Sequence, residues 1–108
     1  MISIRPLTKE DERALWEMLA HAAQEPTMEA VMNHPALARY VEGWGRAHDM
    51  GSIAIETGRP IGAAWLRRWS GQDRGFGYID DAIPELAIAV LPAYRGQGVG
   101  TRLLSHLS

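Results

Sequence analysis

Three glycines alternate with other residues in the segment Arg95-Gly96-Gln97-Gly98-Val99-Gly100-Thr101-Arg102. Glycine lets the backbone turn sharply and lets a ligand come close to its N–H groups. A predicted helix follows, and the positive end of its dipole points at the same place. These features together predict an anion-binding site, most naturally for a phosphate.

Two residues of this glycine segment are unfavourable for stability alone. Gly100 falls in the first turn of the predicted helix, where glycine costs about 1 kcal/mol relative to alanine. Arg102 lies near the same helix end, where a cation opposes the helix dipole. A bound polyphosphate would offset both effects, because it binds bare amides and attracts an arginine. The alternative is a plain strand-to-helix turn, although one or two glycines would suffice for that.

Two common phosphate-binding patterns are absent from the segment. The P-loop pattern fails because no lysine follows Gly100. The dinucleotide pattern G-x-G-x-x-G fails because its third glycine position holds Thr101 when counted from Gly96, and Leu103 when counted from Gly98.

A third pattern, [RQ]-x-x-G-x-[GA], is filled by Arg95, Gly98 and Gly100. With the preceding run Ile88-Ala89-Val90-Leu91-Pro92-Ala93-Tyr94, the segment resembles motif A of the GCN5-related N-acetyltransferases. The start of the chain, Ile4-Arg5-Pro6-Leu7-Thr8 ahead of an acidic helix, also looks like the opening of this family. The resemblance therefore covers essentially the whole chain.

The resemblance implies acetyl-CoA as co-substrate, no metal, and a role for each matched position. The amides of residues 96–101 would hold the pyrophosphate, with Arg95 beside it and Arg102 able to reach a phosphate. The main chain of residues 88–90 would pair with the pantetheine arm, and an amide near Val90 or Leu91 would polarise the thioester carbonyl. The implied cofactor-binding residues are Ile88, Ala89, Val90, Arg95, Gly96, Gln97, Gly98, Val99, Gly100, Thr101 and Arg102.

Direct acyl transfer also needs a base, because the acceptor amine is mostly protonated at neutral pH. Glu85, at the start of the predicted cofactor strand, is the best local candidate, and Asp80 and Asp81 are weaker ones. The alternative for Glu85 is a solvated residue at a strand end. Tyr94 is not the usual acid of the family, which lies on a later helix.

The elements that must position these residues follow the order β-α-α-β-β-β-α. Apolar alternation, caps and turn residues predict strands over 2–5, 52–57, 61–69 and 85–91, a turn over 57–60 and a loop over 70–77. Helices are predicted over 8–23, over 27–44 with a division at Pro35, and over 99–107 with Leu103, Leu104 and Leu107 as the apolar stripe. The fold class is α/β (α+β by some schemes), with a mixed, mostly antiparallel central sheet flanked by helices.

The strand over 85–91 is nearly continuous in apolar residues, which suits a strand covered on both faces. The family's domain usually continues with a strand, a helix and a hairpin, and these are missing because this chain stops at Ser108. Without the next strand, residues 85–91 become an apolar sheet edge. Three explanations stay open: a fragment or incompletely recorded sequence, a homodimer in which a second copy completes the domain, and a degenerate relative.

Composition narrows the remaining function classes for this single partial domain, residues 1–108. The net charge of −2, from 11 basic and 13 acidic residues, argues against a nucleic-acid binder. There are no cysteines for disulfides or nucleophiles, and no apolar run approaches the roughly 20 residues of a membrane span. The N-terminus is not a secretory signal, so a cytoplasmic protein is expected. The four histidines lack metal-ligand spacing: His21, His34, His48 and His106.

The sequence therefore predicts an N-acetyltransferase that moves an acetyl group from acetyl-CoA to a primary amine. The alternative is a non-catalytic CoA-binding or interaction module built on the same fold. The acceptor is not encoded in any motif, although acidic residues could attract a cationic amine. The tryptophans are expected mostly in the core, with one of them a candidate for lining the acceptor pocket: Trp16, Trp44, Trp65 and Trp69.

Overall fold

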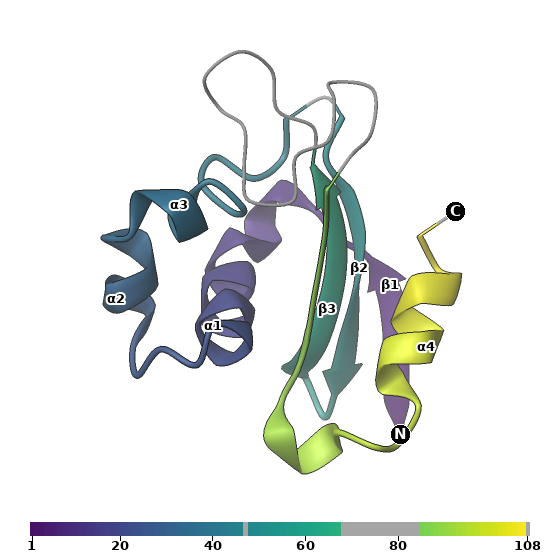
Figure 1. The fold of residues 1–108 in the computed structure, drawn as a ribbon. Coiled ribbons are helices and arrows are strands. Elements are labelled where there is room, and N and C mark those ends of the chain that lie inside the picture. Colours follow the sequence, from purple (N-terminus) through teal and green to yellow (C-terminus); the bar gives the residue numbers. More distant parts are fainter. Residues whose placement is uncertain (47, 68–84, 108) are drawn as a thin grey trace.

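The computed structural model describes residues 1–46, 48–67 and 85–107 (Figure 1). In chain order the elements are β1 (Ile2–Pro6), the 3-10 turn η1 (Lys9–Asp11), α1 (Glu12–Ala22), α2 (Met28–Met32), α3 (Pro35–Ala38), β2 (Met50–Glu56), β3 (Arg59–Arg67), β4 (Glu85–Val90), the 3-10 turn η2 (Pro92–Tyr94) and α4 (Val99–Ser105). This order confirms the predicted one, with the second helical stretch divided at Pro35. The predicted loop over 70–77 and the last residues of the strand over 61–69 lie outside the described residues.

The sheet has the strand order β1-β2-β3-β4, and all three neighbouring pairs are antiparallel. The β2–β3 turn is shorter than predicted, because Arg59 already pairs with Glu56. Only two residues connect the strands, and both have positive φ, +52° at Thr57 and +74° at Gly58. Such turns match the right-handed twist of the flanking strands.

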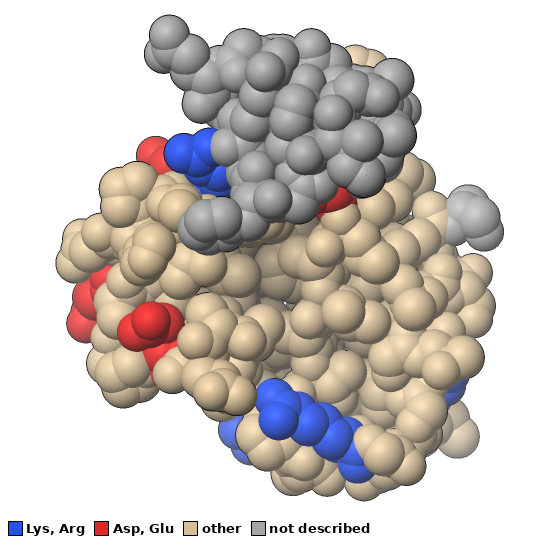
Figure 2. All heavy atoms as spheres, in the orientation of Figure 1, with Lys and Arg blue, Asp and Glu red and all other residues tan. Residues whose placement is uncertain are grey.

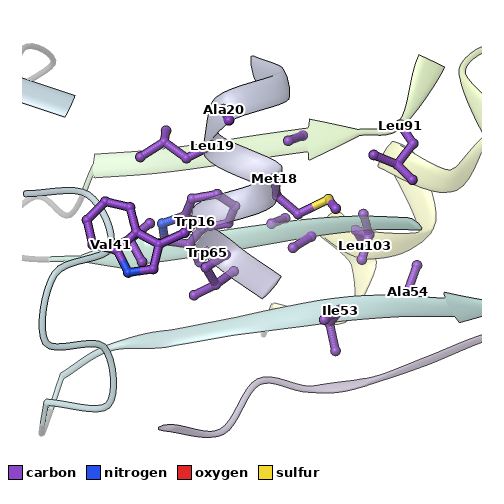
Figure 3. Packing of buried hydrophobic residues seen from close by; sticks show 14 of the residues in the cluster. Trp16, Met18, Leu19, Ala20, Val41, Ile53, Ala54, Trp65, Leu91 and Leu103 are labelled. Atoms are coloured by element: carbon purple, nitrogen blue, oxygen red, sulfur yellow. The ribbon is translucent and has the colours of Figure 1, made fainter. Parts of the chain in front are cut away.

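Helices cover both faces of the sheet (Figure 1). Helices α1, α2 and α3 lie on one side, where Leu15 and Met18 of α1 are fully buried. Met18 belongs to the same core cluster as Trp65 (Figure 3). Helix α4 lies on the other side, where Leu103 is also fully buried. The buried hydroxyl of Ser52 donates to Leu103 O at 2.8 Å, which fastens the last turn of α4 to β2.

Two expectations about apolar residues are wrong. β4 is not covered on both faces, because Leu86 and Ile88 are 48% and 39% exposed while Ala89 is buried. β4 is also an edge strand of the sheet that the described residues form, which is the position predicted from the sequence. In α4 the apolar stripe includes Leu103, but Leu104 is 43% exposed.

Candidate functional site

The glycine segment turns through two residues with left-handed backbone, Gly96 at φ +80° and Gly98 at φ +79°. A Cβ atom added at either position would meet nothing within 4 Å. These glycines are therefore required by the backbone conformation and not by crowding, and the space beside them is open. Gly100 differs, because a Cβ there would make only an ordinary contact, 3.5 Å from Ile88 Cδ1.

Helix α4 begins directly after Gly98, which is its N-cap residue. Arg102 N–H donates to Gly98 O at 3.1 Å, the first i→i−4 bond at this end. The N–H groups of Val99, Gly100 and Thr101 lie ahead of that bond and have no acceptor within the helix. The first turn carries no acidic residue and no side-chain cap, so these amides suit an external anion.

In the sheet that the described residues form, the outer edge of β4 runs toward this loop, and the hydrogen-bonding groups of β4 alternate between this edge and β3. Leu91 N–H donates to Ile61 O at 2.9 Å, so its amide is taken by β3. By strand alternation the main-chain groups of Ala89 also face β3, whereas those of Ile88 and Val90 face the edge. Of the three residues expected to pair with pantetheine, only Ile88 and Val90 therefore present main-chain groups at the outer edge of β4. The Leu91 N–H is bonded to β3, so it is not available to donate to a thioester.

The two arginines that flank the loop have partners of their own. Arg95 Nε donates to Val90 O at 3.0 Å, on the outer edge of β4. Arg102 Nη2 donates to Ile2 O at 3.2 Å, which turns its guanidinium toward β1. Both side chains are exposed, and Figure 2 shows basic atoms at the end of the molecule where η2 lies. Arg95 thus lies beside the loop as expected, while Arg102 is directed away from it.

Glu85 opens β4 and is only 8% exposed. The interpretation of Glu85 as a solvated strand-end residue is therefore wrong. Tyr40 Oη donates to Glu85 Oε2 at 2.8 Å, although the two residues are 45 positions apart. Tyr40 follows α3 and carries no local motif, so no signal in the sequence predicts this contact. The weaker candidates Asp80 and Asp81 lie outside the described residues.

The segment that carries Tyr40 is fastened to β3 by one buried arginine. Arg67, 1% exposed, donates from Nε and Nη2 to the carboxylate of Asp49, both at 3.0 Å. Its Nη1 donates to Arg39 O at 3.0 Å and to Glu42 O at 2.8 Å. The guanidinium also lies 5.5 Å from the ring centroid of Trp44.

An apolar groove of about 250 Å³ lies between α1, the segment around α3 and the edge of β4. Its lining residues are Leu19, Ala22, Ala23, Leu37, Tyr40, Leu86, Ala87 and Ile88. Trp16, Trp44 and Trp65 are buried core residues and do not line it, and Trp69 lies outside the described residues. Tyr40 thus belongs both to the groove wall and to the Glu85 contact.

Neither a metal site nor a membrane span is found in the part of the chain that the structure describes. Within it, no three histidine or acidic side chains are grouped so that they could hold a metal ion. None of its helices is long and apolar enough to cross a membrane.

Tyr94 Oη donates to Glu56 Oε1 at 2.8 Å, and this hydrogen bond raises the pKa of Tyr94 above 10.0.

An antiparallel sheet whose edge strand leads through a left-handed glycine loop into a helix is the architecture of an acetyltransferase domain. The model of the acetyltransferase (GNAT) family matches residues 13–108, and the chain therefore belongs to the GNAT family. No curated protein matches the sequence.

Solved structures agree with this assignment at the level of the fold. A GCN5-related N-acetyltransferase from Ralstonia eutropha JMP134 aligns with a TM-score of 0.63 at 18% identity, over 99% of this chain and 73% of that chain. A GNAT-family acetyltransferase from Staphylococcus aureus Mu50 gives 0.64 at 17%, over 99% and 63%. The protein yncA from Salmonella typhimurium, described as an acetyltransferase and solved with its cofactor acetyl-CoA, gives 0.63 at 21%, over 99% and 61%. The chain thus spans between 61% and 73% of these three structures.

Proposed function

We propose that this chain is an acetyl-CoA-dependent N-acetyltransferase that moves an acetyl group directly to a primary amine. The observation that carries the proposal is the loop with left-handed Gly96 and Gly98, which opens into α4 beside the outer edge of β4. The open space at both glycines and the unbonded amides of the first helical turn suit a diphosphate. Membership of the GNAT family supports acetyl-CoA as the ligand.

The described residues of the loop and of β4 fit this co-substrate, which supplies the acetyl group as an activated thioester. The amides of residues 96–101 would hold the diphosphate, with Arg95 at its side. The outward main-chain groups of Ile88 and Val90 would pair with the pantetheine arm as an added strand. One of these two amides would donate to the thioester oxygen, where negative charge develops during attack.

In this proposal, Glu85 is the base. Its carboxylate takes the proton that the acceptor ammonium must lose before its nitrogen can attack. The new C–N bond then forms as the C–S bond breaks, and the thiolate of CoA is the leaving group. Replacing Glu85 with Gln should therefore lower turnover while leaving CoA binding unchanged.

Calorimetry with CoA, run beside thiol release from acetyl-CoA with a panel of primary amines, tests the proposal. We expect CoA to bind and at least one amine to give turnover. Gly98→Ala should weaken CoA binding at least tenfold, because alanine strains a backbone at φ +79°. Gly43→Ala is the matched control, since Gly43 has φ +68°, equally open surroundings and no place in the loop.

The second candidate is a non-catalytic CoA-binding or interaction module. It is favoured by the coverage of the solved relatives, since parts of those chains have no counterpart in these 108 residues. CoA binding without turnover of any amine would favour this candidate. A chain that does not bind CoA at all would contradict both.

A further inference from the structure

We propose that Tyr40 is a positioning residue for the base Glu85, an inference that rests on the transferase function proposed above. Its phenol O–H donates to Glu85 Oε2 at 2.8 Å. A hydrogen bond to a charged acceptor is among the stronger ones in proteins, and this one fixes the direction of a carboxylate that is only 8% exposed. Tyr40 thereby sets the orientation in which Glu85 meets the proton of the acceptor amine.

The backbone of Tyr40 is held from several directions, so its hydroxyl has a defined place. Trp65 Nε1 donates to Tyr40 O at 2.9 Å. Arg67 donates to the carbonyl of Arg39 before it and to that of Glu42 after it, at 3.0 and 2.8 Å. These bonds fasten the segment 39–42 to β3, the strand next to the one that carries Glu85.

The register of the sheet completes the connection. Arg67 stands opposite Glu85, so the strand that anchors the Tyr40 segment is the partner of the strand that presents the base. A displacement of residues 39–42 would therefore move the phenol relative to the carboxylate. This arrangement is what a positioning residue requires, because its own placement is independent of the ligand.

Tyr40 also lines the apolar groove of about 250 Å³ between α1 and the edge of β4. A ligand in that groove would contact the residue that holds the base. Because Leu19, Leu37 and Leu86 form other parts of the lining, an acceptor with an apolar body next to its amine suits the groove.

The test compares Tyr40→Phe with Tyr94→Phe in the 108-residue chain. Tyr94 makes an equivalent phenol–carboxylate bond, to Glu56 at 2.8 Å, and is not part of the site proposed here, so it is a matched control. Turnover is measured with the amine that the wild-type chain accepts, and folding is followed by thermal unfolding. We expect Tyr40→Phe to lower kcat about tenfold with an unchanged KM for acetyl-CoA, and Tyr94→Phe to leave kcat within twofold of wild type.

The double variant Tyr40→Phe/Glu85→Gln separates positioning from a general structural role. If Tyr40 acts through Glu85, the phenylalanine causes no further loss of kcat once the carboxylate is gone. An unchanged kcat in Tyr40→Phe, or a full additional loss in the double variant, overturns the assignment of Tyr40 alone. A wild-type chain that binds CoA but turns over no amine overturns the transferase function and this assignment with it.

Discussion

Replacing Asp49 with Ala should destabilise the protein severely, because Asp49 is the counter-charge of the buried Arg67. Their side chains are 2% and 1% exposed, and two hydrogen bonds of 3.0 Å join them. Removing one partner of a buried ion pair leaves an uncompensated charge, at a cost of about 3–5 kcal/mol. Domains of this size have a total stability of roughly 5–15 kcal/mol, so the loss is a large share of it.

Urea unfolding at constant m-value measures this loss, and the melting temperature should fall by roughly 15–30 °C. Glu17→Ala is the control, because its ion pair with Arg13 is long, 3.8 Å, and both side chains are well exposed. We expect that variant to lose no more than about 0.5 kcal/mol. The double variant Arg67→Met/Asp49→Leu should recover only part of the stability, because apolar side chains can replace a buried pair but not the hydrogen bonds from Arg67 to Arg39 O and Glu42 O. A loss below about 1 kcal/mol in Asp49→Ala would refute the reasoning.

Three further variants test other parts of the fold. The hydrogen-bonded ion pair with Arg5 lowers the pKa of Asp11 below 3.8. The stabilisation from this pair is therefore present above pH 3.8 and is lost as the pH falls through the lowered pKa of the folded state. Asp11→Asn should make the free energy of unfolding in urea depend less on pH on the acid side. Ser52→Ala should lose about 1 kcal/mol in urea unfolding with its bond to Leu103 O. Gly100→Ala should raise stability by up to about 1 kcal/mol and weaken CoA binding in calorimetry.

Each of these three expectations has an outcome that contradicts it. An acid-side slope that is the same in Asp11→Asn and wild type would remove the ion pair from the explanation. Ser3→Ala is the control for Ser52, because Ser3 is exposed and its bond to Ile55 O is 3.5 Å long; equal losses in the two variants would count against the fastening of α4. A Gly100→Ala variant that binds CoA as wild type does would separate this glycine from the ligand.

Local signals in the sequence were sufficient for most of the elements and for the glycine loop. Thr8 and the acidic residues after it mark the start of the first helical region, and Pro35 divides the second. Gly96, Gly98 and Gly100 lie close together in the sequence, so their spacing predicts the loop without information about distant residues. The CoA side of the proposed site could therefore be predicted without a structure.

The acceptor side could not be predicted, because its contacts join residues far apart in the chain. Tyr40 and Glu85 are 45 positions apart, and Arg67 and Asp49 are 18 apart, with no periodicity that relates them. The apolar run of β4 was misleading for a different reason. A strand with one exposed apolar face and a strand covered on both faces have the same composition. Only the packing around Leu86 in the folded protein, which leaves this side chain exposed, distinguishes them.

In the proposed mechanism, the spacing along β4 favours Ile88 over Val90 as the residue whose amide donates to the thioester. Along an extended strand, Glu85 is about 10 Å from Ile88 and about 17 Å from Val90. The side chain of a base, the amine and the thioester carbonyl must span the separation between base and amide, and the base must reach its proton directly or through one water, so the shorter separation is favoured. Ile88 lines the groove beside Tyr40, whereas the carbonyl of Val90 already accepts from Arg95. Ile88→Pro removes that N–H at a sheet edge without removing a bond to β3. We expect it to lower kcat at least tenfold more than Leu86→Pro, the control at the next outward position; equal losses would exclude Ile88 as the donor.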